Sequence, residues 1–331
     1  MKRLITYLII VSIIAILSAC GGAEESDETE NQQDSTEERT VTIEDARGEQ
    51  TIEGTPENIV VLEWSYAEHL LSLGVQPAGV ADLDGFHQWV NIDESFDESV
   101  QDVGTRQEPN LEAIARLDPD LIIAVDFRHG QYMDSLEEIA PVVTFAPYGE
   151  EAVQDHYQNM IDEFQTVAEI VNKEDEAAQE IERLENFISE QKGRVEEAGL
   201  AGSDYIVTQA FSAQNTPTLR LFTENSIVAQ VMSKLGFENA YEAEEVEPYG
   251  YSEVTVEALQ NFQEEDLQFL YIVQEEDNIF ENQLAGNPVW ENLTFVQEGN
   301  THALPGDTWT FGGILSTEVL TEQLVDAMVS E

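Results

Sequence analysis

The chain has 331 residues, and 68 acidic residues against 13 lysines and arginines give it a formal net charge of −55. A surface of this sign repels nucleic acid and anionic lipid, which argues against a phosphate-binding role. We interpret the acidity as an adaptation to a salty or alkaline exterior, where dissolved salt screens the repulsion between like charges.

The first twenty residues, MKRLITYLIIVSIIAILSAC, have the pattern of an export signal. Lys2 and Arg3 precede an apolar run that is shorter than the roughly 20 residues of a membrane-spanning helix, so an anchor of that kind is the weaker alternative. LSAC resembles a bacterial lipobox, which predicts a signal peptide over 1–19 and a lipidated Cys20. Residues 20–39 are acidic and lack large aliphatic side chains, as a solvated tether would. Cys20 is the only cysteine, so no intrachain disulfide can form.

Strands alternate with short helices over residues 40–150, which favours a lobe built on a parallel sheet. NIVVLEW and DPDLIIAVD are predicted strands, while NLEAIARL is a predicted helix. From Glu151 to Asn172 the apolar residues recur on one side of a helix about 33 Å long. We expect residues 151–173 to be a connecting helix.

The pattern of the first lobe returns after Gly202. DYIVTQAF echoes NIVVLEW, SIVAQVMSKLGFENAY echoes YAEHLLSLGVQPAGV, and TVEALQNFQEEDLQFLYIV echoes NLEAIARLDPDLIIAV. Three echoes in one order predict an α/β protein of two similar lobes, 40–150 and 174–331, joined by one long helix. Two such lobes leave a ligand cleft at the carboxyl ends of their strands.

Sequence motifs of catalysis are scarce. The chain has no GxSxG elbow, no GxxxxGK[ST] loop, no GxGxxG after a strand, no CxxC and no HExxH, and its five histidines lack paired metal-ligand spacing. We therefore expect a binding protein without catalytic residues or a direct metal site. A secreted hydrolase and a surface scaffold are the alternatives from other classes.

Three arginines differ in placement from the other basic residues. Arg106, Arg128 and Arg220 each follow or end a predicted strand, on loops that the two-lobe arrangement points into the cleft. A guanidinium group offers a planar fork of donors, which suits bidentate contact with carboxylate or hydroxamate oxygens. We predict that the three converge on an anionic ligand, and a structural ion pair is the alternative for each.

Aromatic residues supply further candidates for the wall of the site. GDTWTFGG, residues 306–313, sets Trp309 and Phe311 among glycines, which suits a loop that contacts a small ligand. A cluster of core aromatics is the alternative. Trp64, Tyr249 and Tyr251 are additional candidates.

The lipobox, the acidic tether, VGTRQEPNLEAIARLDPDLII, TPTLRLFTENS, TVEAL and GDTWTFGG occur in one order. With these segments the chain resembles the ferric-siderophore-binding lipoproteins of Gram-positive bacteria, most closely those that take citrate-derived hydroxamate or carboxylate siderophores. The resemblance implies the periplasmic-binding-protein-like fold with a single connecting helix, and no enzymatic activity. It also implies that Arg106, Arg128, Arg220, Trp309 and Phe311 contact the siderophore, whose own oxygens hold the Fe(III), so that no cofactor is needed.

The same resemblance implies the partners of the protein. Glu112 and Glu257, which occupy matching places in the internal repeat, would dock onto the two halves of an ABC permease dimer. The protein would act as a monomer, held by lipid on the extracellular face of the cell membrane, and would not bind nucleic acid. A haem- or cobalamin-binding lipoprotein of the same fold is the alternative, and it would require a histidine or tyrosine at the axial position of the metal.

Overall fold

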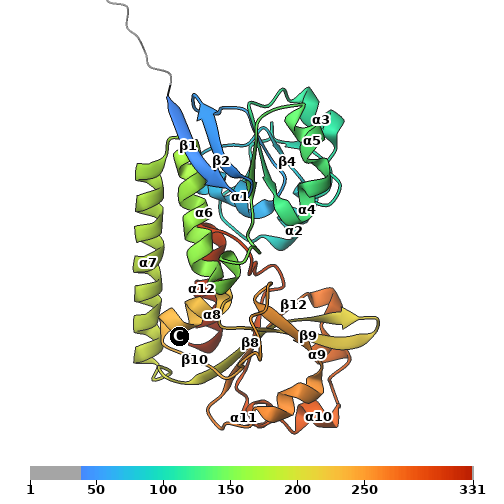
Figure 1. Ribbon diagram of the computed structural model, residues 1–331. Coiled ribbons are helices and arrows are strands. Elements are labelled where there is room, and N and C mark those ends of the chain that lie inside the picture. The colour runs from blue at the N-terminus through green and yellow to red at the C-terminus, as the bar shows by residue number, and fades with distance from the viewer. Residues whose placement is uncertain (1–38, 330–331) are drawn as a thin grey trace, which may run out of the picture. The chain divides into compact units, whose positions relative to one another are not determined.

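The computed structural model describes residues 39–329. The predicted signal peptide, Cys20 and nearly all of the predicted tether lie outside the described residues. The described residues belong to one compact unit, which contains two α/β lobes (Figure 1). The predicted fold class is confirmed.

The sheet of the N-terminal lobe has five parallel strands within the described range, in the order β5-β4-β3-β6-β7. They are β3 (Ile59–Val61), β4 (Gly79–Val80), β5 (Gln101–Asp102), β6 (Leu121–Val125) and β7 (Val142–Phe145). Successive side chains point to opposite faces, so Ile59 and Val61 join one core cluster and Val60 joins another. Because both faces are covered, the central strands β3 and β6 are continuous apolar runs, whereas the edge strand β5 is polar and exposed.

The remaining elements of this lobe cover the sheet or precede it. An antiparallel ribbon of β1 (Thr40–Asp45) and β2 (Gly48–Glu53) begins the described chain. The helices are α1 (Trp64–Ser72), α2 (Leu83–Trp89), α3 (Leu111–Arg116), α4 (Asp126–His129), the 3₁₀ helix η1 (Gly130–Tyr132) and α5 (Met133–Glu137). The strand predicted at NIVVLEW is shorter than expected, since Glu63 caps α1 and Trp64 is the first residue of that helix.

The sheet of the C-terminal lobe is mixed rather than parallel. Its main path within residues 39–329 is β11-β9-β8-β12-β13, and β10 also pairs with β8. The strands are β8 (Asp204–Ala213), β9 (Thr216–Phe222), β10 (Glu238–Asn239), β11 (Tyr251–Val254), β12 (Gln268–Val273) and β13 (Thr301–Leu304). β8 and β9 form a hairpin whose turn residues, Gln214 and Asn215, both have positive φ angles, and this turn makes β9 antiparallel to β8.

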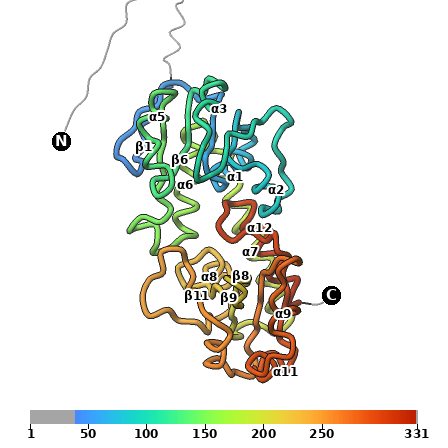
Figure 2. Tube along the Cα trace, turned by 90° about the vertical axis from the view of Figure 1, so that its right-hand side faces the viewer, coloured from blue at the N-terminus to red at the C-terminus, as the bar shows by residue number. Residues whose placement is uncertain are grey.

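Short helices connect the strands of the second lobe. They are α8 (Ile227–Leu235), η3 (Val256–Asn261), η4 (Glu275–Asp277), α9 (Ile279–Asn282), α10 (Pro288–Glu291) and α11 (Thr294–Glu298), and α12 (Ile314–Met328) follows β13. Figures 1 and 2 both place the chain that leads into α12 between the two sheets. The last part of the chain therefore returns to the junction of the lobes.

Two helices carry the chain from the first sheet to the second. The helix predicted at 151–172 is α6 (His156–Ile170), and it is preceded by a short 3₁₀ helix, η2 (Ala152–Gln154). It begins late because Asp155 is extended and its side chain accepts a hydrogen bond from the Gln158 amide, as an N-cap does. The longer helix α7 (Glu174–Glu197) follows and packs against both α6 and α12. In residues 39–329 no helix combines the length and apolar character needed to cross a bilayer.

Candidate ligand-binding site

A cavity of about 390 Å³ lies between the lobes, within the usual range of small-molecule pockets. On the N-terminal side its lining follows the carboxyl ends of the parallel strands: Glu63 comes after β3, Arg106 after β5, Arg128 after β6 and Tyr148 after β7. On the C-terminal side β9, β11 and the segment before α12 contribute. The ligand cleft predicted at the strand ends is therefore present.

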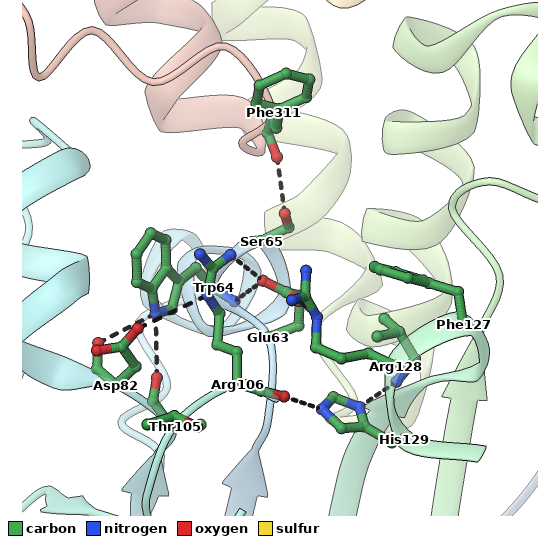
Figure 3. Close-up of polar contacts among 12 residues, drawn as sticks. Glu63, Trp64, Ser65, Asp82, Thr105, Arg106, Phe127, Arg128, His129 and Phe311 are labelled. Carbon is green, nitrogen blue, oxygen red and sulfur yellow. Dashed lines mark hydrogen bonds and ion pairs between the residues drawn. The ribbon is translucent and has the colours of Figure 1, made fainter. Parts of the chain in front are cut away.

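All three predicted arginines line this cavity. Two of them share one carboxylate: Arg106 Nη1 lies 2.8 Å from Glu63 Oε1, and Arg128 Nε lies 3.0 Å from Glu63 Oε2 (Figure 3). Glu63 is only 6% exposed. Glu63 therefore orients two guanidinium groups with one carboxylate, and the N–H donors that it does not use can bind an anion.

Arg106 is held from several sides. Its guanidinium group lies 3.5 Å from the centre of the Trp64 ring, and its Nε lies 3.9 Å from an Asp82 carboxylate oxygen. Trp64, which we expected in the wall of the site, does not line the cavity. It is 2% exposed, its indole N–H donates to the Ala81 carbonyl, and its ring supports Arg106 from behind by a cation–π contact.

His129 fixes the backbone that carries Arg106. Its Nδ1 accepts a hydrogen bond from the Val125 amide at 3.0 Å, so Nε2 carries the proton and donates to the Arg106 carbonyl at 2.8 Å (Figure 3). The ring is fully buried, and this burial lowers the pKa of His129. A neutral imidazole therefore ties the Arg106 loop to the end of β6.

Arg220 enters the cavity from β9 of the other lobe. Its guanidinium group lies 4.7 Å from the centre of the Phe211 ring and 4.6 Å from that of Tyr251. Its Nε lies 3.1 Å from a Glu253 carboxylate oxygen. The aromatic rings restrict the side chain, and the pairing with Glu253 is more exposed to water than that of the other two arginines with Glu63.

The predicted aromatic residues Trp309, Phe311, Tyr249 and Tyr251 line the cavity. Tyr249 is 49% exposed and packs edge-on against Tyr148. Ser65 of α1 donates a hydrogen bond to the Phe311 carbonyl, which ties this loop to the N-terminal lobe (Figure 3). The indole N–H of Trp309 is buried and has no hydrogen-bond partner in the described part of the chain, so it is available to a ligand oxygen.

One face of α6 supplies lining residues that we did not predict. His156, Asn159, Met160 and Glu163 follow the helical spacing of three and four residues. The Tyr66 hydroxyl donates to Glu163 Oε2 at 2.9 Å, and burial raises the pKa of Glu163 to about 7. In the sequence this helix is recognised only by the spacing of its apolar residues. That spacing does not indicate which of its polar residues face the cavity.

The two predicted docking residues lie outside the cavity. Glu112 is in the first turn of α3, Glu257 is in the first turn of η3, and both side chains are exposed. Within residues 39–329 no group of three or more His, Cys, Asp or Glu side chains is arranged to hold a metal ion.

Two α/β lobes around a preformed cavity, with arginines from both lobes in its wall, define a substrate-binding protein. A family model described as "Periplasmic binding protein" matches residues 59–308. The Fe(3+)-citrate-binding protein YfmC of Bacillus subtilis (strain 168) is 33% identical over 286 residues, which cover 86% of this chain and 84% of that protein. The iron(3+)-hydroxamate-binding protein FhuD of Escherichia coli (strain K12) is 27% identical over 263 residues, which cover 79% of this chain and 83% of that protein.

Among solved structures, the siderophore-binding protein FhuD of Vibrio cholerae with bound Fe3+-Desferal is similar with a TM-score of 0.73 and 31% sequence identity. The match covers 83% of this chain and 98% of that chain. This chain belongs to the periplasmic binding protein family.

Proposed function

We propose that the protein captures a ferric siderophore of the hydroxamate or carboxylate type and delivers it to an ABC permease for iron uptake. The observation that carries the proposal is the set of arginines from both lobes in one cavity, two of which share the buried Glu63. A ferric chelate presents oxygen atoms with partial or full negative charge at its surface. Guanidinium forks and the free indole N–H of Trp309 are suited to these oxygens.

The relatives support the same ligand class, since their names specify ferric citrate and ferric hydroxamate as ligands. In this proposal Arg106, Arg128 and Arg220 bind the chelate, while Trp309, Phe311 and Tyr249 enclose it. The chelate supplies the ligands of the iron.

The location and partners belong to the same proposal. Lipidation of Cys20 would hold the mature protein on the outer face of the membrane, with residues 20–39 as the tether. Lobes over 40–150 and 174–331, connected through 151–173, would each present one glutamate, Glu112 or Glu257, to the permease dimer. The protein would bind its ligand as a monomer.

A fluorescence titration tests the ligand class. Purified protein is titrated with a ferric schizokinen-type siderophore, ferric citrate and haem while tryptophan emission is followed. We expect saturable quenching by a ferric siderophore, because Trp309 lines the cavity and Trp64 lies directly under Arg106. The variant Trp309→Phe keeps an aromatic ring but loses the indole N–H, so it should bind more weakly and with a smaller change in emission.

The other results of this titration are also informative. A response to haem alone would favour the haem-binding alternative of the same fold. If none of the three ligands changed the tryptophan emission, the result would contradict the proposed function.

A further inference from the structure

Glu163 is a carboxyl group that lines the same cavity as the three arginines. It lines the cavity from α6, accepts a hydrogen bond from the Tyr66 hydroxyl and is also bonded by the Asn159 side chain. Within residues 39–329 no lysine or arginine forms an ion pair with it. The cavity arginines are paired with Glu63, Asp82 and Glu253 instead. Any positively charged partner of Glu163 would therefore come from outside these residues.

The absence of a cation is costly for a carboxylate in this position. A half-buried carboxylate without a partner charge loses much of its solvation, and this desolvation raises the pKa of Glu163 to about 7. Two neighbouring acids, Asp162 and Asp126, act in the same direction. If the role of residue 163 were only to accept the hydrogen bond from Tyr66, a neutral glutamine would serve without this cost.

A second acceptor lies on the same face of α6. One ring nitrogen of His156 is hydrogen-bonded to the backbone of Pro248, and since proline has no N–H, the histidine must be the donor. The other nitrogen, Nε2, is buried and has no hydrogen-bond partner among residues 39–329. Burial lowers the pKa of His156, so the ring is neutral and Nε2 is an acceptor. The α6 side of the cavity thus offers acceptors, whereas the arginine side offers donors.

We propose that Glu163 is a specificity-determining residue that receives a protonated amine on an arm of the ferric chelate. The inference rests on the proposed function and narrows its ligand class. The ligand would present its metal-binding oxygens to the arginines and an ammonium group to α6. Opposite charges at two places in one cavity would fix the orientation of the chelate, because the reversed orientation brings like charges together.

A matched pair of ligands tests this inference. Ferric desferrioxamine B carries a free primary amine, and N-acetylation removes that charge while leaving the iron centre unchanged. Dissociation constants for both forms are measured by tryptophan quenching at about pH 8.5, where Glu163 is ionised and an alkyl amine is still protonated. We expect the wild-type protein to prefer the amine form by roughly tenfold to a hundredfold, the effect of one charged hydrogen bond.

Two variants assign the preference to Glu163. In Glu163→Gln the side chain still accepts the Tyr66 hydrogen bond but carries no charge, so the ratio of the two affinities should fall to about one. Asp162→Asn removes a charge from the exposed side of the same helix and should keep the wild-type ratio.

Each outcome decides a different question. Equal affinity of the wild-type protein for both forms, or a ratio that Glu163→Gln leaves in place, would overturn the inference while leaving the proposed function standing. Failure of both forms to bind would overturn the proposed function for hydroxamate chelates and the inference with it. The wild-type comparison does not depend on how well either variant folds.

Discussion

Glu63 determines how two arginines are held at the ligand cavity. Its two carboxylate oxygens lie within hydrogen-bond distance of Arg106 and Arg128, which come from separate loops. One buried carboxylate thereby orients two guanidinium groups, and Asp82, 3.9 Å from Arg106 Nε, supplies a second acid. The forks are thus oriented before a ligand arrives, which reduces the entropy cost of binding.

We predict that Arg106→Ala weakens binding of the ferric siderophore by about 1.5–3 kcal/mol, the range of a hydrogen bond to a charged group. Quenching titrations of the variant and the wild-type protein measure the difference. Arg116→Ala is the control, because Arg116 is exposed in the last turn of α3 and does not line the cavity. Unchanged affinity in Arg106→Ala would remove Arg106 from the site.

Glu163 should make stability depend on pH. Its pKa is about 7 in the folded protein, against the ordinary value of 4.5 that applies in the unfolded chain, so the two states differ in protonation between these values. Below about pH 4.5 the carboxyl is protonated in both states, and its stabilising contribution is complete. As pH rises to about 7 this contribution is lost, by up to about 3 kcal/mol, because the unfolded chain ionises more readily.

The variant Glu163→Gln removes this titration. We compare the free energy of unfolding of the variant with that of the wild-type protein. We expect the variant to gain stability relative to the wild type between pH 5 and pH 8. Urea denaturation at the two pH values measures the change. Tyr66 and Asn159 favour the ionised carboxylate and Asp162 and Asp126 oppose it, and all four are retained in the variant. A difference that is the same at both pH values would contradict the raised pKa.

At the scale of elements, α1 and α12 are joined at the junction of the lobes. Glu68 of α1 is buried and accepts hydrogen bonds from the amide and the hydroxyl of Ser316, both at 2.7 Å. It satisfies an amide in the first turn of α12, where the helix dipole also favours a negative charge. This contact fixes the start of α12 and thereby the end of the loop that carries Trp309 and Phe311.

We predict that Gly313→Ala disturbs this junction. A Cβ at position 313 would lie 2.6 Å from His69 Nδ1 and 3.2 Å from a Glu68 oxygen, and both neighbours are buried. Overpacking of this kind should destabilise the protein by about 1–3 kcal/mol and weaken ligand binding through displacement of the aromatic loop. Thermal unfolding and the quenching titration measure the two effects.

Gly193→Ala is the matched control within α7, where nothing beyond the adjacent residues and the helix's own backbone lies within 4 Å of the added Cβ. It should stabilise the helix by about 0.5–1 kcal/mol and leave binding unchanged. Equal behaviour of the two alanine variants would show that the glycine at position 313 is not needed for close packing.

The elements differ in how far their sequences predict them. Parallel strands such as β6 are recognisable because an unbroken apolar run is a local feature. The repeat correctly predicts a second α/β lobe, but it also suggests a second parallel sheet, and the β8–β9 hairpin makes that sheet mixed. The turn at Gln214 and Asn215 has a weak sequence pattern, since positive φ at both positions is usually marked by glycine.

At the scale of the whole molecule, the sequence predicts cationic residues of the site better than acidic ones. Arg106, Arg128 and Arg220 stand out because basic residues are rare. Arg106 and Arg128 follow the parallel strands β5 and β6 as predicted, whereas Arg220 lies within β9 rather than on a loop. Glu63 and Glu163 are two acids among 68, and only the tertiary fold shows that these two line the cavity. Whether the remaining acids reflect a salty or alkaline habitat stays a prediction.

The docking prediction concerns the whole molecule, because it requires one contact on each lobe. Glu112 and Glu257 are exposed in the first turn of corresponding helices and do not line the cavity. Replacing both by alanine should leave the dissociation constant of the siderophore within about twofold, since neither group reaches the ligand and distant exposed charges are screened by salt. Uptake of radiolabelled ferric siderophore should stop in cells that depend on this protein.

A control with the same change of net charge separates docking from general electrostatics. Glu138, the C-cap of α5, and Glu182 of α7 are exposed and belong to neither α3 nor η3, and their double alanine variant should support normal uptake. If both double variants lost uptake equally, the permease would respond to overall negative charge rather than to two defined glutamates. Normal uptake by the variant that combines Glu112→Ala and Glu257→Ala would refute the docking assignment, because the permease would then recognise the protein without either carboxylate.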